Sequence, residues 1–344
     1  MSRFYIKELS PNELGTPKAD GKVSRGRFVY VSKQLTEDFF PHLSKTINND
    51  SALIPVIPPF SNTRVYSKFV YHNDKYNRPE GTRDEFRLYL NAGIDPDGSF
   101  YQAGDIVVFE RVNSEEEIED KEFIMPNYFM YRFEPGDAYY ETLKIVLSRS
   151  DVKGKAHALA NDLKISAPET IEARLEEAAV VISDDAKELI EVTTREIEES
   201  SEPGSLEAIR GANLFNAVNF RDFVLLAYGY KCAITKRVIS WKELNNLEAA
   251  HIKPKAHVGT FLPCNGIALS RDMHWAFDKG LLTINDEFKV VIHGDVMHTY
   301  LGDFHGEQII VPTEPYFQPA KQFLAHHREL IFGLFKHSGV IRSL

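Results

Sequence analysis

Four polar side chains have the types and spacing for metal-assisted chemistry. They are His251, Asn265, His274 and Asp278, and all lie within residues 232–282. His274 and Asp278 are four positions apart, so a helix would place an imidazole and a carboxylate on one face. An imidazole nitrogen and a carboxylate oxygen on one face can share a cation. The spacing therefore indicates a cation site built from one short helix.

The sequence around these side chains predicts a strand, a turn and a helix. Residues 247–252 form a short strand-like run, which Pro254 closes because proline cannot continue a strand ladder. Residues 263–266 predict a turn, since Asn and Gly tolerate positive φ. Residues 272–279 read as a helix that ends at Gly280. These elements would bring the four polar side chains together.

This order of elements, carrying His, Asn and His, resembles the ββα-metal finger of HNH nucleases. The pieces CAIT, EAAHI-x-P, NGIAL and H-x-x-FD-x-GL occur in that order, as in one subgroup of the superfamily. The resemblance implies that His251 is the general base, a role that suits imidazole because it titrates near neutral pH. It implies that Asn265 holds the loop, and through it the ring of His251. His274 and Asp278 would hold one divalent cation, Mg²⁺ or Mn²⁺.

One position departs from the pattern of the family. Many HNH enzymes carry Asp or His immediately before the base as another metal ligand, and here that residue is Ala250. The cation would then have two protein ligands plus water and phosphate, which Mg²⁺ accepts. Taken singly, each histidine could be an ordinary half-buried residue and Asp278 a helix-end carboxylate. The ordered set favours the nuclease interpretation.

Composition restricts the class of protein. The 344 residues are 43% hydrophobic, enough for more than one domain. No run of eighteen apolar residues occurs, so we expect no membrane span, and the first residues lack the apolar core of a signal peptide. Cys232 and Cys264 have no CxxC partner, which argues against a zinc knuckle and a disulfide framework. We expect a cytoplasmic location.

The net charge of −10 is concentrated in one segment. Residues 169–202 contain twelve acidic and three basic residues, whereas residues 1–90 contain fourteen basic and ten acidic residues. Steering of a charged partner depends on local patches rather than on the total, so the charge does not exclude DNA binding.

The first 135 residues predict a mainly β domain. Short runs rich in β-branched and aromatic residues are bounded by Gly, Pro, Asn and Asp, which suggests a barrel or a sandwich. The predicted strands are residues 4–6, 27–31, 52–56, 63–71, 85–90 and 105–110. Two polar loops, residues 10–26 and 72–83, interrupt them.

These loops carry a second resemblance. The pieces IKELSPNELGTPKADG, YVS, DFFPHL, YHNDKYN and GTRDEFRLYL follow one another as in the effector domain of EcoRII-type restriction endonucleases. That domain is a B3-like pseudobarrel whose two arms grip the DNA major groove, so the resemblance makes each loop an arm. Arg reads guanine, Asn reads adenine and Lys binds phosphate. The candidate DNA contacts are Lys18, Lys22, Arg25, Lys75, Asn77, Arg78, Thr82, Arg83 and Arg87.

Together these patterns predict an α+β multidomain chain. We expect a B3-like β-pseudobarrel for DNA recognition at residues 1–150 and a helical acidic linker at residues 151–208. A ββα-metal HNH nuclease domain would occupy residues 209–344. The linker prediction rests on helix-forming composition with apolar residues three and four positions apart.

The expected function is that of a sequence-specific, type II-like restriction endonuclease acting on double-stranded DNA. One finger per chain suggests a homodimer, and a cognate methyltransferase acting on the same site is a further expected partner. Three alternatives remain open: a modification-dependent HNH endonuclease that selects methylated DNA, a catalytically inactive DNA-binding regulator, and a non-specific or structure-directed nuclease.

Overall fold

The computed structural model describes residues 3–15, 26–112, 126–165, 168–176, 178–199, 214–241 and 244–334. The chain forms two compact units, Met1–Leu214 and Phe215–Leu344. In the part of the chain that the structure describes, no helix has both the length and the apolar character needed to cross a bilayer.

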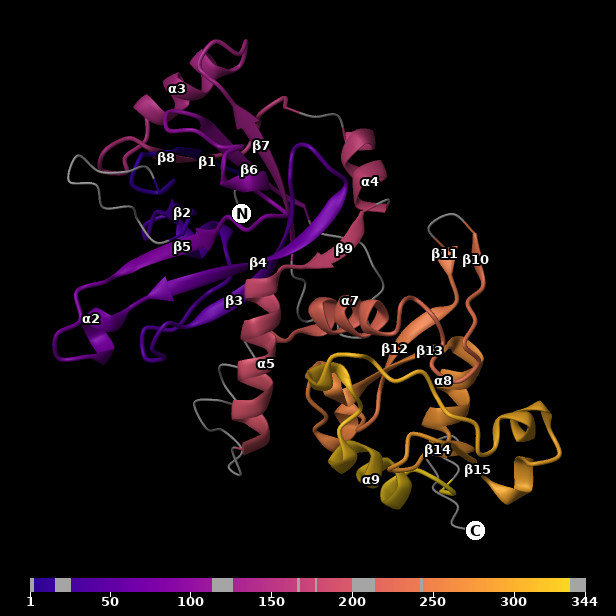
Figure 1. Ribbon diagram of the computed structural model, residues 1–344. Helices are drawn as coiled ribbons and strands as arrows, with labels where there is room; N and C mark the ends of the chain where they lie inside the picture. Colours follow the sequence, from indigo (N-terminus) through magenta and orange to yellow (C-terminus); the bar gives the residue numbers. More distant parts are fainter. Residues whose placement is uncertain are drawn as a thin grey trace. The chain divides into compact units, whose positions relative to one another are not determined.

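A mixed sheet dominates the first unit and curls into a nearly closed barrel (Figure 1). Within the described residues its strands run in the order β2-β5-β4-β3-β7-β6-β1-β8, and β9 pairs with β4 outside this order. The pairs β3–β7 and β4–β9 are parallel and the others are antiparallel. The strands are β1 (Phe4–Glu8), β2 (Phe28–Val31), β3 (Ser51–Ile57), β4 (Thr63–His72), β5 (Glu85–Tyr89), β6 (Ile106–Val112), β7 (Asn127–Phe133), β8 (His157–Ala160) and β9 (Ala179–Ile182).

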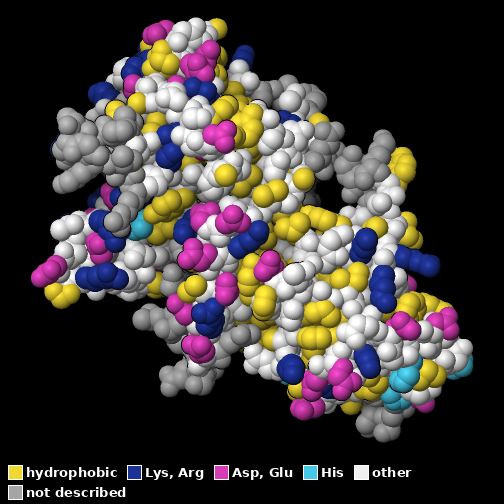
Figure 2. Space-filling view, viewed as in Figure 1, with side chains coloured by type: hydrophobic (Ala, Val, Ile, Leu, Met, Phe, Trp, Pro, Cys, Tyr) yellow, Lys and Arg dark blue, Asp and Glu magenta, His cyan; other side chains and the backbone are white. Residues whose placement is uncertain are grey.

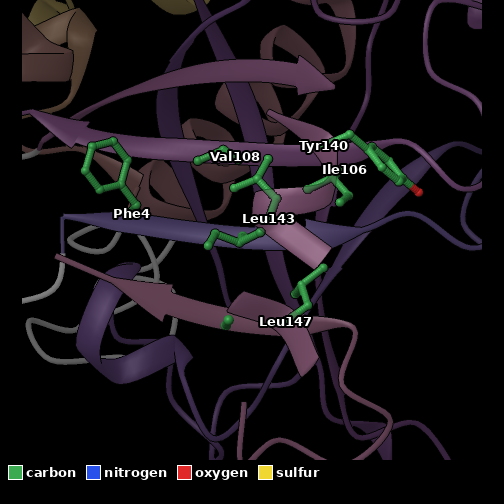
Figure 3. Close-up of a cluster of buried hydrophobic side chains, with 8 residues drawn as sticks. Phe4, Ile106, Val108, Tyr140, Leu143 and Leu147 are labelled. Carbon is green, nitrogen blue, oxygen red and sulfur yellow. The ribbon is translucent and has the colours of Figure 1, made fainter. Parts of the chain in front are cut away.

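Alternation along β1 shows how the sheet is buried on both faces. Tyr5 points to an aromatic cluster inside the barrel, where its ring centroid lies 5.7 Å from Phe39 and 5.3 Å from Phe40. Phe4 and Ile6 point to the opposite face, because successive strand residues alternate sides. There they join a buried cluster under helix α3 (Tyr140–Ser148), seen in Figure 3. Its other members are Ile106, Val108, Tyr140, Leu143, Leu147 and Ala158.

The predicted strands of the first 135 residues all form. The structure adds β7, which lies between β3 and β6 in the sheet. Two short helices complete this region, α1 (Thr36–Phe39) and α2 (Asp74–Asn77), and α2 lies in the second of the two polar loops. The mainly β character of this region is therefore confirmed, whereas the particular likeness to a B3 domain stays a prediction.

Residues 151–208 differ from the expected helical linker. They contain helices α4 (Pro168–Glu176) and α5 (Asp184–Glu199), but also the strands β8 and β9, which pair with β1 and β4. Helix α5 buries Ala186, Ile190 and Thr193 and packs on β4, while Figure 2 shows acidic side chains along its exposed surface. The segment is part of the first unit, because its short apolar runs complete the sheet.

The second unit positions the predicted finger. Helix α7 (Ala217–Ala227) packs on the hairpin β12–β13, and α8 follows β13 directly. Asn216 caps α7, since its side chain accepts hydrogen bonds from the backbone of Val218 and Asn219. The remaining elements are β10 (Ser240–Trp241), β11 (Leu244–Asn245), β12 (Leu247–His251), β13 (Gly266–Ser270), α8 (Arg271–Asp278), β14 (Leu282–Ile284), β15 (Val290–Ile292) and α9 (Lys321–Leu330).

Candidate active site

The hairpin β12–β13 places His251 at its open end. His251 is the last residue of β12 and pairs with Gly266, the first residue of β13. A side chain at Gly266 would meet α7, because a Cβ atom there would lie 2.3 Å from Cγ2 of Val224 and 2.9 Å from the ring of Phe220. Glycine at this position therefore lets α7 approach the end of the hairpin that carries His251.

The ring of His251 lies between two aromatic side chains. It stacks on Phe220 at a centroid distance of 4.3 Å and meets Phe261 edge-on at 5.4 Å. Its Nε2 atom is buried and has no hydrogen-bond partner among the described residues. Burial lowers the pKa of His251 to about 4, and the charge of His274 acts in the same direction. The imidazole is therefore neutral at pH 7, with a nitrogen able to accept a proton.

The fully buried side chain of Asn265 closes the loop that follows His251. Its Oδ1 accepts a hydrogen bond from the backbone N–H of Lys253 at 2.8 Å. Its Nδ2 donates to the backbone carbonyls of Lys253 at 3.1 Å and Thr260 at 2.9 Å. The backbone carbonyl of Asn265 also accepts from Ile252 at 2.8 Å. One amide thus fixes both ends of the loop between β12 and β13.

Helix α8 brings His274 and Asp278 together as the i, i+4 spacing predicts. Nε2 of His274 lies 3.4 Å from Oδ2 of Asp278. On the other side of the ring, Nδ1 lies 2.7 Å from Oε2 of Glu248 on β12. The His274 side chain is 16% exposed and that of Asp278 is 51% exposed, so the pair opens to solvent on the Asp278 side.

The pair has the donor set for a divalent cation with few protein ligands. Neighbouring ligands of an octahedral Mg²⁺ ion, each about 2.1 Å from it, are about 3.0 Å apart, close to the observed separation. Ala250 is buried opposite Ile267 and supplies no ligand. Among the described residues, no group of three or more His, Cys, Asp or Glu side chains is arranged around a common metal position. His274 and Asp278 therefore fit an ion completed by water and phosphate.

Sequence reasoning did not single out Glu248, Phe220 or Phe261. Glu248 was visible as the one acidic residue in an apolar strand, two positions before Ala250. The two phenylalanines gave no such signal, because phenylalanines in a helix and in a loop are ordinary core residues. Their proximity to His251 depends on how α7 and the loop fold over the hairpin.

The structure places six of the nine candidate DNA contacts. Lys18, Lys22 and Arg25 lie outside the described residues. Of these six, Lys75, Arg78 and Thr82 have exposed side chains.

The other three candidates of this region make contacts within the unit. Nδ2 of Asn77 donates to the carbonyl of Lys45 at 3.0 Å, and Nε of Arg83 donates to Asp74 at 2.8 Å. Arg87 pairs with Glu85 and stacks over Phe28. Arg83 remains 41% exposed at its side chain, whereas Arg87 is 18% exposed. The side chains of Asn77 and Arg87 therefore stabilise this region by internal contacts rather than project into solvent.

A pocket of about 540 Å³ opens beside the second loop. Tyr71 and Phe86, stacked 4.1 Å apart, form part of its wall, and Tyr76 lines it with a half-exposed ring. Asp84 accepts hydrogen bonds from the hydroxyls of both tyrosines at 2.9 Å and from Lys33 at 2.7 Å. Although burial opposes ionisation, these hydrogen bonds lower the pKa of Asp84 to about 2. The carboxylate therefore holds three lining side chains in place.

Comparison with known proteins identifies one part of the chain. Residues 232–285 match the family model described as HNH endonuclease. None of the curated proteins compared with the chain matches it. Among solved structures, the chain is similar to one titled "Modification dependent TagI restriction endonuclease", with 23% sequence identity and a TM-score of 0.28. The match covers 36% of this chain and 41% of that one, so the chain spans less than half of that structure's length.

The matched segment coincides with the described geometry. It begins at Cys232 and includes the hairpin β12–β13, helix α8 and all four polar side chains. Nucleases of the HNH type generally depend on a divalent metal and act on DNA. The chain contains an HNH endonuclease domain at residues 232–285.

Proposed function

We propose that the chain is a sequence-specific DNA endonuclease of the restriction type. In this proposal the second unit hydrolyses the phosphodiester bond and the first unit recognises the DNA. The observation that carries it is the neutral imidazole of His251, whose buried Nε2 atom has no hydrogen-bond partner among the described residues, inside the segment that matches the HNH family. A buried nitrogen of this kind costs stability unless a substrate or water group occupies it, which supports a catalytic role.

His251 would accept the proton of the attacking water at its unprotonated ring nitrogen. Its lowered pKa keeps it unprotonated at neutral pH, and stacking on Phe220 keeps the ring from turning. Asn265 would hold the loop against which the ring rests, through its hydrogen bonds to Lys253 and Thr260.

His274 and Asp278 would hold the divalent cation, Mg²⁺ or Mn²⁺. When bound, the cation supplies positive charge that stabilises the scissile phosphate and the leaving oxygen. The exposed carboxylate of Asp278 leaves the open side of this pair accessible to a phosphate group. Two protein ligands therefore suffice in this proposal, and Ala250 does not exclude catalysis.

The first unit would contact DNA through its two polar loops. In the second loop, the exposed Lys75, Arg78 and Thr82 and the partly exposed Arg83 would reach phosphates and base edges. Asn77 and Arg87 would support the loop through their internal contacts. Lys18, Lys22 and Arg25 of the first loop lie outside the described residues and stay candidate contacts from the sequence.

A second candidate function is supported by the pocket of the first unit. The pocket has a volume of about 540 Å³ and an exposed aromatic ring at Tyr76. It is large enough for one nucleotide turned out of a DNA duplex. Enzymes that do chemistry on a base take it out of the base stack and bind it against aromatic side chains, and a pocket that reads a modified base can use the same contacts. The pocket therefore favours selection of methylated DNA as the alternative to reading unmodified bases.

Digestion of methylated and unmethylated phage DNA with Mg²⁺ tests both candidates. Discrete fragments from unmethylated DNA would support the sequence-specific enzyme, and fragments from methylated DNA alone would support the second candidate. His251→Ala should abolish cleavage and leave DNA binding unchanged, while the exposed His298→Ala serves as the matched control. DNA binding without any cleavage would refute both and favour a DNA-binding regulator; smeared fragments would favour a non-specific nuclease.

The proposed enzyme acts as a homodimer, since two fingers are needed to cut both strands of a duplex at one site. A cognate methyltransferase would protect the same site in the sequence-specific case. Analytical sedimentation with and without a duplex that carries the mapped site measures the mass of the protein and so tests the homodimer. A monomer bound to that duplex would refute it.

A further inference from the structure

Glu248 connects the strand of the finger to its helix. It lies on β12 two residues before Ala250, so the two side chains project from the same face of the strand. Its carboxylate contacts α8 at two points: Oε2 is 2.7 Å from Nδ1 of His274, and Oε1 is 3.2 Å from Nε of Arg271. The two partners are three positions apart and share one helix face. One side chain thus joins β12 to the helix that carries the proposed cation ligands.

The contact with Glu248 determines how His274 presents its ring. A carboxylate only accepts hydrogen bonds, so Nδ1 of His274 carries the hydrogen in this contact. In the neutral ring the lone pair is then on Nε2, the nitrogen that lies 3.4 Å from Oδ2 of Asp278. A lone pair that faces a carboxylate oxygen is repulsive unless a proton or a metal cation lies between them.

We propose that Glu248 is a positioning residue for the cation site. Its hydrogen bond fixes the orientation and tautomer of His274, so that Nε2 and the Asp278 carboxylate form a preformed pair of ligands. The inference rests on the proposed function, in which His274 and Asp278 hold the cation. Glu248 is not itself a ligand here, because it contacts the ring on the side opposite to Asp278.

The sequence at Ala250 makes this role important. With no acidic residue immediately before the base, the ion has two protein ligands in the proposed site, and misorienting one of them removes half of the set. Glu248 and His274 have side chains that are 40% and 16% exposed, so attraction between their charges is screened. Selection of the tautomer does not depend on that attraction, since it requires only an acceptor at Nδ1.

Calorimetric titration of the full chain with Mn²⁺, without DNA, tests this role. Glu248→Ala should weaken Mn²⁺ binding at least tenfold, since loss of the group that orients a metal-binding histidine costs about 10–100-fold in affinity. Glu248→Gln should stay within about threefold of the wild type, because its amide oxygen still accepts from Nδ1. Arg271→Ala removes the other partner of Glu248 and is the matched control, with unchanged affinity.

A nitrogen-15 spectrum of the metal-free chain, at a pH where the His274 ring is neutral, provides a second readout. It should show hydrogen on Nδ1 of His274 in the wild type and in Glu248→Gln, and a mixture of tautomers in Glu248→Ala. Equal Mn²⁺ affinity in Glu248→Ala and wild type would overturn the positioning role. So would equal losses in the Ala and Gln variants, or no binding by the wild type at millimolar Mn²⁺.

These outcomes separate the inference from the proposed function. A wild type that binds Mn²⁺ in a Glu248-dependent way but cuts no DNA would refute the nuclease proposal alone. A wild type that cuts DNA, with Mn²⁺ affinity unchanged in Glu248→Ala, would refute the positioning role alone.

Discussion

Burial of His251 gives a quantitative prediction for the pH dependence of cleavage. Contact with Phe220 and Phe261, with the charge of His274, lowers its pKa to about 4, whereas an exposed imidazole titrates near 6.5. A general base works only when unprotonated. The rate that depends on His251 should therefore be retained above pH 4 and lost as the pH falls through that value.

The difference is largest between the two pKa values. At pH 5.5, a group with a pKa of about 4 is roughly 97% unprotonated, whereas one with a pKa of about 6.5 is roughly 10% unprotonated. The cleavage rate of the wild type at pH 5.5 should therefore stay within about twofold of its rate at pH 7.5. An exposed imidazole would instead lose about tenfold over the same range.

Phe261→Ala is the perturbation that tests the cause. Phe261 is half-buried and forms one wall beside the His251 ring, so its removal should admit water and raise the pKa toward 6.5. The ratio of rates at pH 7.5 and pH 5.5 should then rise toward ten. Phe304→Ala is the control, because Phe304 is also half-buried in the second unit and makes no ring contact with His251 among the described residues.

The assay is single-turnover cleavage of a plasmid, with Mg²⁺ saturating at each pH so that metal binding does not limit the rate. Burial would be refuted as the cause of the lowered pKa of His251 if the cleavage rate of the wild type fell tenfold between pH 7.5 and pH 5.5 and that of Phe261→Ala fell by the same factor.

Protonation of His251 should also change the free energy of unfolding with pH. Because its pKa is lower in the folded than in the unfolded chain, the unfolded state binds more protons between pH 6.5 and pH 4. The free energy of unfolding of the second unit should fall by about 2 kcal/mol from pH 7 to pH 5 for this group, and less in Phe261→Ala. Urea denaturation at the two pH values measures the difference, and an equal change in both proteins would contradict the explanation.

Three further substitutions test other parts of the chain. Asn265→Ala removes three side-chain hydrogen bonds of a buried loop and should lower the free energy of unfolding by about 2–4 kcal/mol; a loss below about 1 kcal/mol in urea denaturation would argue against this. Asp278→Ala should raise the Mg²⁺ concentration for half-maximal cleavage at least tenfold, with little change in melting temperature because the side chain is 51% exposed; an unchanged Mg²⁺ requirement would remove Asp278 from the cation site. Arg78→Ala should weaken DNA binding and reduce the slope of affinity against salt by about one if it contacts phosphate, and unchanged binding at all salt concentrations would exclude the contact.

Much of the finger's frame could be predicted from local signals. The expected strand at 247–252 is β12 and the helix at 272–279 is α8. The turn at 263–266 is a 3-10 turn over Pro263–Asn265, but Gly266 already belongs to β13 with a φ of −116°, so the positive φ expected of this turn does not occur. Gly280 ends the helix with a φ of +73°, as expected of a residue without a Cβ atom. These features are set by neighbours within one or two turns of chain, so sequence patterns report them.

Contacts made by folding over longer distances were not predictable in the same way. The stacking of His251 on Phe220 joins residues 31 positions apart, and Glu248 meets His274 across 26 positions. The strands β8 and β9 were missed because each has four residues in a segment whose composition favours helices. Their partners β1 and β4 lie more than one hundred residues earlier, where no local pattern refers to them.

The pairing of β8 and β9 with early strands also constrains how the protein can be made. During synthesis, β1 and β4 leave the ribosome long before the two strands that pair with them, so their free edges remain open to wrong partners in the meantime. A fragment that stopped at residue 150 would keep those edges permanently exposed and should aggregate. Because α5 follows β9 directly, its acidic surface is added as soon as the sheet is complete. The strand that covers the free edge of β4 and the acidic helix that follows it are therefore made together, after the rest of the sheet.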